Sequence, residues 1–521
     1  MSEREFVTDV AIVGAGPSGL TAANLLADRG WRVALIERHP NLFGLPRAGH
    51  IDHEAFRILQ GTGCLHPVLE TAQPKKRNVW LDRNGDVLLE FKHWAESTSG
   101  FFSGSMYQPD LEEALLAGLR HKGNLVNLYQ GYEVAEIGQS ADDVTLTARP
   151  FEKTGEPLTV TARYVIAADG AQSKLRDLLD IERDEFAVAE RWMVVDVAYG
   201  ARRDFGPTAV VGDPRRPHFY GTLGREHHRF EWKLFDEEDT QDYLNPDRAW
   251  ELLAVDGVKP GEVEIIRQAV FVFEYKMARN WLSGRIALIG DAAHTMPPTM
   301  GQGLCSGMRD AANLAWKLDL VMRGLSQPSL LETYQSERYP HVKAWADLSK
   351  QAGEIAFVTD ITAADARDEK FRRGKRPDMG GTPLLGEGAF SRADGDAADI
   401  GKPFPQRMIL HQGEEIRFDD LAGYGFCVVG LVDSMEALDA EGKDALARLG
   451  CSFLYLGDSD QPRGFADLDG FYTHYFEEQG ARFFILRPDK YILASARDVA
   501  ELADAIRNAA TAIAVKAVEP A

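Results

Sequence analysis

The chain has 521 residues, of which 45% are hydrophobic and 26% charged, and its formal net charge is −22. This length predicts two or three domains, and the negative charge argues against nucleic acid or an anionic membrane as a partner. No apolar run reaches the length of a membrane span, and the polar first residues do not resemble a secretory signal, so we expect a cytoplasmic protein.

The cysteines have neither a CxxC pair nor the spacing of metal ligands. They are Cys64, Cys305, Cys427 and Cys451. We expect reduced, mostly buried thiols and no metal site.

A dinucleotide-binding unit is predicted at the N-terminus. Residues 9–13 and 31–36 have the pattern of strands, and residues 20–29 that of the helix between them. The turn before this helix, GAGPSG, fits the motif GxGxxG and includes Ala15. Gly14 allows the tight turn, Gly16 lets a pyrophosphate approach, and Gly19 lets helix and strand pack closely.

An acidic residue closes the second strand. Glu37 stands where the ribose diol of a dinucleotide needs an acceptor. This acid favours an unphosphorylated ribose, as in NAD or FAD, over NADP, although the adjacent Arg38 weakens the preference.

Several polar residues have both a functional and an ordinary interpretation. Arg47, in the segment PRAGHIDHE, could contact a cofactor phosphate or ring, or could be a solvated loop arginine. His50, Asp52 and His53 could act as acid–base groups, or could simply form hydrogen bonds. Gln108, just before a predicted helix, is either a cofactor contact or a helix cap.

Two strand patterns follow. A hairpin is predicted around Asn84-Gly85, and the last of several strands leads into Asp169-Gly170. From residue 187 to residue 273 the pattern alternates and is rich in aromatic residues, which indicates an antiparallel sheet. Its aromatic face is either a wall for an apolar substrate or ordinary core.

The stretch GDAAHTMPPTMGQG, residues 290–303, lies between a short buried strand and a predicted helix. Its prolines stiffen the loop, while Gly301 and Gly303 let a ligand approach the backbone amides. The helix start suits an anionic group, and Asp291 can accept a hydrogen bond from a sugar or ribityl hydroxyl. The alternative is an ordinary connection between strand and helix.

The C-terminal part of the chain predicts a small separate domain. Residues 330–354 are expected to form a helix, and residues 361–401 a segment that connects it to the C-terminal domain. The remaining order of strands and helices is typical of a thioredoxin-like α/β domain, which without CxxC cannot carry out dithiol chemistry.

Three motifs in this order, GAGPSG, Ala168-Asp169-Gly170 and GDAAHTMPPTMGQG, resemble those of the single-component FAD-dependent aromatic hydroxylases. Finer features are similar to the 3-(3-hydroxyphenyl)propionate hydroxylase branch, in residues 46–55, 192–196, 213–217, 306–311 and 313–318. This chain differs from that branch at two places. His50 and His53 replace a glycine and an acid, and the loop Pro298-Thr299-Met300 is different.

The resemblance implies an α/β fold in which a Rossmann-like FAD-binding domain is interleaved with a mainly antiparallel β-sheet substrate domain. We expect the FAD-binding domain over residues 1–186, with a substrate-domain hairpin near 76–105, and over residues 281–356. The substrate domain is expected over 187–280, a linker over 357–400 and a thioredoxin-like domain over 401–521.

The resemblance also implies non-covalent FAD and a transient NAD(P)H donor, for which the chain has no second GxGxxG. The first glycine motif would bind the pyrophosphate, and Glu37, next to Arg38, the adenosine ribose. The other expected cofactor contacts are Arg47, Gln108, Asp169, Gly170, Asp291 for the ribityl chain, and Pro298, Gly301 and Gly303 beside the flavin.

The implied reaction is hydroxylation of a phenol ortho to its hydroxyl. Reduced flavin and O₂ form a C4a-hydroperoxide, and the protein must exclude water to prevent its loss as H₂O₂. The expected substrate is 3-(3-hydroxyphenyl)propionate or a related phenolic acid. The candidate acceptor for the phenol hydroxyl is the Pro298 carbonyl, and the side-chain candidates are His50, Asp52, Tyr107, Tyr220 and Tyr275. A substrate carboxylate would need Arg191, Arg215 or Arg225.

Alternatives stay open. The substrate could be another phenol, such as a hydroxybenzoate, resorcinol or a polyketide, or the protein could be an oxidase that makes only H₂O₂. A nicotinamide dehydrogenase is disfavoured by Asp291 and its loop. The chain could also form a homodimer.

Overall fold

The structure is a computed structural model that describes residues 4–75, 77–92, 98–151, 155–199, 205–378, 381–390 and 399–513. Its contacts divide the chain into two compact units. The first comprises Met1–Ala95, Phe102–Arg309 and Val342–Thr382, and the second Glu96–Phe101, Asp310–His341 and Pro383–Ala521.

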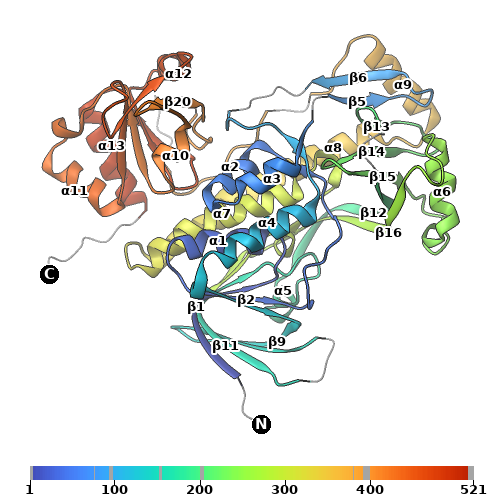
Figure 1. Ribbon diagram of the computed structural model, residues 1–521, viewed down its shortest axis with the longest axis horizontal. Coiled ribbons are helices and arrows are strands. Elements are labelled where there is room, and N and C mark those ends of the chain that lie inside the picture. The colour runs from blue at the N-terminus through green and yellow to red at the C-terminus, as the bar shows by residue number, and fades with distance from the viewer. Residues whose placement is uncertain are drawn as a thin grey trace. The chain divides into compact units, whose positions relative to one another are not determined.

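A largely parallel sheet in the first unit forms the predicted nucleotide-binding fold (Figure 1). The strand order is β17-β18-β11-β1-β2-β8, and β10 and β9 extend it in antiparallel fashion from β11. Val10, Ala11 and Ile12 of β1 are fully buried, as expected for a central strand covered on both faces. The strands are β1 (Arg4–Val13), β2 (Val33–Glu37), β8 (Val126–Gln130), β9 (Tyr132–Gln139), β10 (Val144–Pro150), β11 (Leu158–Ala167), β17 (Leu282–Ser283) and β18 (Ile286–Leu288).

Helices pack beside this sheet, and Figure 1 shows α1 and α4 side by side next to β1 and β2. Helix α1 begins at Pro17, where the missing N–H is not needed. Helix α2 begins after Asp52, whose carboxylate accepts a hydrogen bond from the N–H of Ala55 at 2.9 Å. The helices are α1 (Pro17–Asp28), α2 (His53–Thr62), α3 (Leu65–Thr71), α4 (Gln108–Arg120) and α5 (Lys174–Leu178).

The second sheet of this unit is the predicted antiparallel one, with the order β19-β16-β12-β15-β14-β13-β5-β6. The predicted hairpin forms as β5 and β6, and it joins the sheet through a parallel pairing of β5 with β13. The strands are β5 (Arg77–Leu81), β6 (Val87–Lys92), β12 (Arg183–Ala198), β13 (Thr208–Val211), β14 (His218–Leu223), β15 (His227–Lys233), β16 (Glu264–Ala278) and β19 (His294–Thr295).

The two faces of this antiparallel sheet have different surroundings. Met193, Val195 and Trp232 point to a core that helix α6 (Pro246–Val255) completes. Their neighbours in sequence, such as Trp192, point to the other face, because successive side chains of a strand alternate. One face is therefore ordinary core, and the other borders a cavity, where a wall for an apolar substrate stays a prediction.

Two parts of the first unit were not expected. A three-stranded sheet joins β3 (His50–Ile51), β7 (Gly104–Ser105) and β4 (Gln73–Pro74). Within the segment expected to be a linker, α9 (Ile361–Arg372) forms. Its Phe371 packs against Leu88 and Leu89 of the hairpin, and this tertiary contact compensates for the weak periodicity. The long helix predicted before it is present as α8 (Glu332–Ala356).

The second unit contains a seven-stranded sheet with the order β21-β20-β24-β23-β22-β25-β26, drawn in orange and red in Figure 1. Strands β22, β23 and β24 pair in parallel with one another, and β25 pairs in antiparallel fashion with both β22 and β26. This arrangement agrees with the thioredoxin-like expectation. The elements are β20 (Met408–His411), β21 (Glu414–Arg417), α10 (Phe418–Ala422), β22 (Cys427–Gly430), α11 (Ala440–Leu449), β23 (Ser452–Leu456), β24 (Gly464–Asp467), α12 (Phe471–Gln479), β25 (Phe483–Leu486), β26 (Ile492–Ala496) and α13 (Val499–Ala512).

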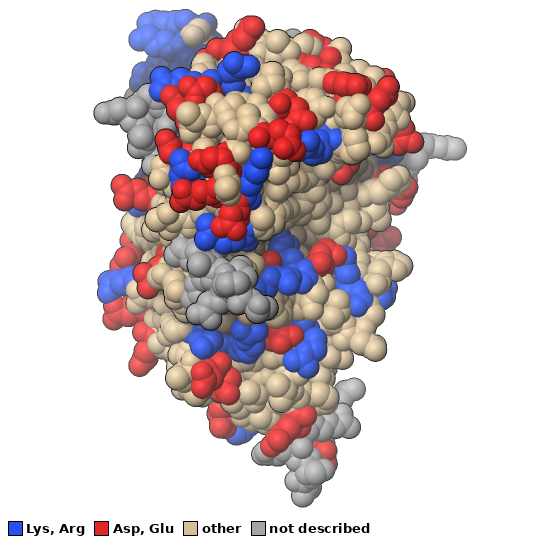
Figure 2. Space-filling model, turned by 90° about the vertical axis from the view of Figure 1, so that its left-hand side faces the viewer, with Lys and Arg blue, Asp and Glu red and all other residues tan. Residues whose placement is uncertain are grey.

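Within the described ranges, no helix combines the length and the hydrophobicity needed to span a membrane. Among the same described residues, there is no group of three or more His, Cys, Asp or Glu side chains that could bind a metal ion. Figure 2 shows acidic and basic side chains interspersed over one face of the molecule.

Candidate functional site

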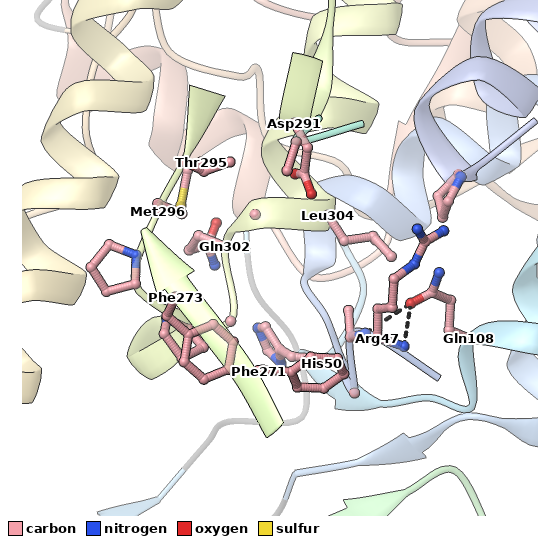
Figure 3. Close-up of a pocket in the computed structure, with 18 of the residues that line it drawn as sticks. Arg47, His50, Gln108, Phe271, Phe273, Asp291, Thr295, Met296, Gln302 and Leu304 are labelled. Carbon is pink, nitrogen blue, oxygen red and sulfur yellow. Dashed lines mark hydrogen bonds between the residues drawn. The ribbon is translucent and has the colours of Figure 1, made fainter. Parts of the chain in front are cut away.

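A cavity of about 1260 Å³ lies in the first unit. The glycine turn after β1, residues 290–303 and the aromatic face of the antiparallel sheet all line it. Figure 3 shows part of this wall, with His50, Phe271 and Leu304 among the labelled residues. Three segments that are far apart in the sequence therefore border one cavity.

The glycine turn has the geometry that its motif predicts. Gly14 has φ of +104°, and a Cβ added there would lie 2.3 Å from the carbonyl oxygen of Ala168. A Cβ on Gly19 would lie 2.0 Å from the carbonyl oxygen of Gly14, so this glycine serves close packing and does not line the cavity. Gly16 precedes α1 without a side-chain cap, which leaves the first N–H groups of the helix available to an anion.

Glu37 lines the cavity and also stabilises the turn. One carboxylate oxygen accepts a hydrogen bond from the N–H of Ala15 at 2.8 Å, and the other from that of His39 at 2.9 Å. Because a carboxylate has about four acceptor positions, both oxygens can still accept from a ribose. Arg38 also lines this end of the cavity.

Gln108 holds the segment that contains Arg47 (Figure 3). Its side-chain oxygen accepts from the N–H groups of Arg47 and Ala48, at 3.0 and 2.8 Å, and its amide donates to Glu112 at 2.7 Å. Buried Arg229 holds the same segment through the carbonyl oxygens of Pro46 and Arg47. The side chain of Arg47 is half exposed and borders the cavity.

Asp169 and Gly170 lie beside the glycine turn in the cavity wall. The Asp169 carboxylate accepts from the Ser173 hydroxyl at 2.6 Å and from the N–H of Leu175 at 3.0 Å, so it caps the start of α5. Burial raises the pKa of this carboxyl, although these hydrogen bonds oppose the rise.

Residues 290–303 form two short helical turns before helix α7 (Gly303–Met322). Asp291 is exposed to the cavity, and its side chain points into it in Figure 3. The Pro298 carbonyl accepts a hydrogen bond from the N–H of Gly301 at 2.8 Å, which leaves one lone pair for a ligand. Gly301 has φ of +66°, and an added Cβ would lie 2.7 Å from the Cβ of His50.

His50 and Asp52 border the same corner of the cavity but differ in chemistry. Nδ1 of His50 lies 3.0 Å from the carbonyl oxygen of Gly104, which can only accept, so this nitrogen carries the proton. Asp52 is buried and pairs with Arg309 at 2.6 Å. Burial alone would raise the pKa of Asp52, but the charge of Arg309 outweighs it and holds the pKa well below its usual range. Asp52 therefore stays ionised and caps α2, which makes it a poor proton acceptor.

Of the three tyrosine candidates, only Tyr275 borders the cavity. Tyr220 of β14 packs in the core on the α6 side, because its neighbours Phe219 and Gly221 face the cavity. Tyr107 does not border the cavity and stacks on His227 with a centroid distance of 3.9 Å. Tyr275 does border it and donates to Asp347 at 2.7 Å.

The three arginines expected for a substrate carboxylate are also outside the cavity wall. The guanidinium of Arg191 donates to three backbone carbonyls and the Thr240 hydroxyl, and Arg215 pairs with Asp213. The wall instead contains residues that the sequence did not single out, of which the strand alternation could have indicated the aromatic ones. They are Lys75, Asn78, Trp80, Trp192, Phe219, Phe271, Phe273 and Gln302.

Comparison with known proteins decides the family. Residues 7–349 match the family model of an FAD binding domain. A protein of Rhodococcus jostii named as a probable NADH-specific resorcinol 4-hydroxylase is 34% identical, over 97% of this chain and 95% of its own length. The chain belongs to the FAD-dependent aromatic hydroxylases. Residues 401–511 of this hydroxylase also match the model of an HcaD C-terminal domain.

Further relatives and structures are similar to this hydroxylase. A 3-(3-hydroxy-phenyl)propionate/3-hydroxycinnamic acid hydroxylase of Mycolicibacterium smegmatis is 31% identical, over 96% of this chain and 92% of its own. The crystal structure of aklavinone-11 hydroxylase with FAD and aklavinone has a TM-score of 0.81 at 22% identity, covering 99% of this chain and 100% of that one. That of the flavin-dependent monooxygenase PieE also has a TM-score of 0.81, at 21% identity, with 97% and 99% coverage.

The residues of this hydroxylase fit FAD. A side chain at Gly14 would collide with the backbone, so this tight turn needs glycine, and a cofactor can come close to the bare backbone there. The uncapped start of α1 suits a pyrophosphate. One cavity continues from this turn to the start of α7 and the aromatic face, which is enough space for a dinucleotide and a small ring.

Proposed function

We propose that this hydroxylase uses NAD(P)H and O₂ to add a hydroxyl group to a phenol, ortho to the existing hydroxyl, and that the phenol carries a short acidic side chain. The observation that carries the proposal is the single cavity, in which the FAD-binding turn and residues 290–303 share a wall with an aromatic sheet face. An aromatic wall suits a ring, and apolar side chains around the ring limit the access of water to the reaction.

The chain's own residues hold the cofactor without a covalent bond in this proposal. The uncapped N–H groups at the start of α1 face the pyrophosphate, and the turn of Gly14, Ala15 and Gly16 lets it approach. Glu37 accepts from the adenosine ribose. Bound FAD supplies the redox chemistry that activates O₂. The other proposed contacts are Arg38, Arg47, Asp169, Gly170, Asp291, Gly301 and Gly303, all of which line the cavity.

His50 is proposed to accept the proton of the phenol hydroxyl. Because Nδ1 carries its proton toward the Gly104 carbonyl, Nε2 is the basic nitrogen of the ring. Losing that proton makes the ring more electron-rich at the ortho position. The remaining lone pair of the Pro298 carbonyl is a second acceptor for the hydroxyl. Asp52 and Tyr220 are left out, for the structural reasons given above.

A second substrate class has support of its own. The relative that is 34% identical is named for resorcinol, whereas the relatives named for 3-(3-hydroxy-phenyl)propionate are 30–32% identical. Resorcinol has a second hydroxyl in place of the acidic side chain. An oxidase that makes only H₂O₂ is a further alternative, and location in the cytoplasm and a homodimer stay predictions.

The test measures NADH and NADPH oxidation by the FAD-loaded protein with a panel of phenols. We expect phenolic acids to stimulate oxidation and to yield catechols, and phenylpropionate, which has no hydroxyl, to do neither. The variant His50→Gln should retain FAD and lose about 10²- to 10⁴-fold in turnover, the range for a general base. Nicotinamide oxidation that no phenol stimulates would contradict the proposal.

A further inference from the structure

Lys75 is a cation in the cavity wall. It follows β4, its backbone N–H donates to the carbonyl of Ser103 at 3.1 Å, and β5 begins two residues later. Asn78 and Trp80 of β5 also line the cavity. Lys75 therefore stands where the aromatic sheet face meets the three-stranded sheet that carries His50.

No described residue gives the Nζ of Lys75 a hydrogen bond or an ion pair. Arg229, another cation that lines the cavity, differs in this respect because it pairs with Asp196 at 2.7 Å. Burial lowers the pKa of Lys75 to about 8. The one titratable group that acts on it is the Cys305 thiol, whose own pKa is raised by burial, so this thiol stays neutral. Lys75 is only partly exposed, and a partly desolvated ammonium group without a counter-ion is stabilised when an anion joins it.

Cys305 also connects Lys75 to the proposed phenol site. The Sγ of Cys305 lies 4.0 Å from the carbonyl oxygen of His50 and 3.9 Å from that of Gly301. The thiol that interacts with Lys75 thus borders the corner where the phenol hydroxyl would approach His50. Cys305 is therefore close enough to Lys75 to interact with it electrostatically and lies within 4.0 Å of this corner.

We propose that Lys75 is the subsite for the carboxylate of a phenolic acid and that it selects acidic phenols over neutral ones. This inference rests on the proposed function, because it requires a phenol in this cavity. The ammonium group donates a charge-assisted hydrogen bond to the carboxylate. The carboxylate in turn favours the protonated lysine, so the bound pair stays charged.

The test compares 3-(3-hydroxyphenyl)propionate with its neutral primary amide as substrates. Wild-type protein should prefer the acid. In Lys75→Met the KM for the acid should rise about 10- to 100-fold, as expected for a lost hydrogen bond between charged groups, while the amide is unaffected. Lys75→Arg should retain most of the preference. Lys259→Met, which removes an exposed lysine away from the cavity, is the matched control.

A pH series adds a signature that a purely structural role does not give. Above pH of about 8 the KM for the acid should rise in the wild type as Lys75 loses its proton. In Lys75→Arg it should stay level, because arginine remains charged. FAD content of each variant shows that its fold is intact.

Two results would overturn the subsite and leave the proposed function standing. One is an equal loss for acid and amide, or an unchanged acid preference, in Lys75→Met. The other is a wild type that hydroxylates neutral phenols better than the acid. A FAD-loaded wild type that hydroxylates no phenol at all contradicts the proposed function itself, and the subsite with it.

Discussion

Two buried groups of charges, one in each unit, are completed in different ways. In the second unit Glu337 is fully buried and meets Lys317 and Arg487, each at 2.9 Å. In the first unit Asp52 meets Arg309 at 2.6 Å, and a second nitrogen of Arg309 donates to Gln302 at 2.5 Å. No member of the first group lines the cavity, whereas Asp52 and Gln302 of the second group both do.

The presence of an oppositely charged partner separates charges that support the fold from charges that are available to a ligand. Glu337 and Asp52 each have cationic partners, so removing one partner leaves an uncompensated charge. Lys75 has no such partner among the described residues, and it lines the cavity. Substitutions in the paired groups should therefore affect stability first, and substitutions on the cavity wall should affect substrate selection.

The largest stability loss is expected for Glu337→Ala. This change leaves Lys317 and Arg487 buried without their shared carboxylate, which typically costs about 3–5 kcal/mol of unfolding free energy. The measurement is urea unfolding. Glu501→Ala, which breaks a surface pair with Arg497, is the control and should cost about 1 kcal/mol or less. Equal losses in both variants would mean that burial does not decide the effect.

Acid should weaken the Glu337 group. Burial by itself would raise the pKa of Glu337, but the charges of Arg487 and Lys317 lower it to about 2, from an ordinary value of 4.5. Because the folded-state pKa is lower than the unfolded one, this stabilisation is present above pH 4.5 and disappears as the pH falls toward 2. Unfolding free energies at several pH values should show this slope, and Glu337→Gln should reduce it. An unchanged slope in the variant would assign the acid sensitivity to other carboxyls.

A smaller loss is expected for Asp52→Asn. Asparagine keeps the cap of α2, and its amide oxygen can still accept from Arg309, but that buried guanidinium loses its counter-charge. The expected loss is therefore that of a hydrogen bond between charged groups, about 1.5–3 kcal/mol. Turnover per bound FAD should remain, because Asp52 supports the site and does not accept the phenol proton. A stable variant that binds FAD and lacks turnover would restore Asp52 as a catalytic residue.

The smallest effect is expected for Tyr220→Phe. The ring packs on the α6 side of the sheet, so losing its hydroxyl should change kcat/KM less than about twofold and stability by less than about 0.5 kcal/mol. Steady-state kinetics alongside Phe271→Ala, from the cavity face, give the comparison. A large kinetic loss in Tyr220→Phe alone would place its hydroxyl in the reaction.

Much of this architecture could be predicted because local chemistry determines it. The glycine turn, Glu37 and residues 290–303 need particular residue types at fixed spacing, and most of these residues line the cavity, although Gly19 does not. Alternation along β12, β14 and β15 predicts a two-faced sheet, but it does not say which face α6 covers. That is why Tyr220 was a candidate.

Contacts between distant segments explain what the sequence did not show. The sheet of β3, β7 and β4 places Lys75 near His50 through pairings across many residues, and no local pattern indicates them. Arg309 belongs to an amphipathic helix, and only the structure pairs it with Asp52 at the start of another helix. Arg191 looked available in sequence, yet backbone carbonyls use its guanidinium.

The central claim is that this cavity directs one atom of O₂ onto a phenol. The direct measurement supplies ¹⁸O₂, NADH and a stimulating phenolic acid to the FAD-loaded protein, and analyses the products by mass spectrometry. The expected product is a catechol that contains one labelled oxygen, with little labelled peroxide. Label found only in H₂O₂ and water, across phenolic acids and resorcinol alike, would contradict it and identify an oxidase.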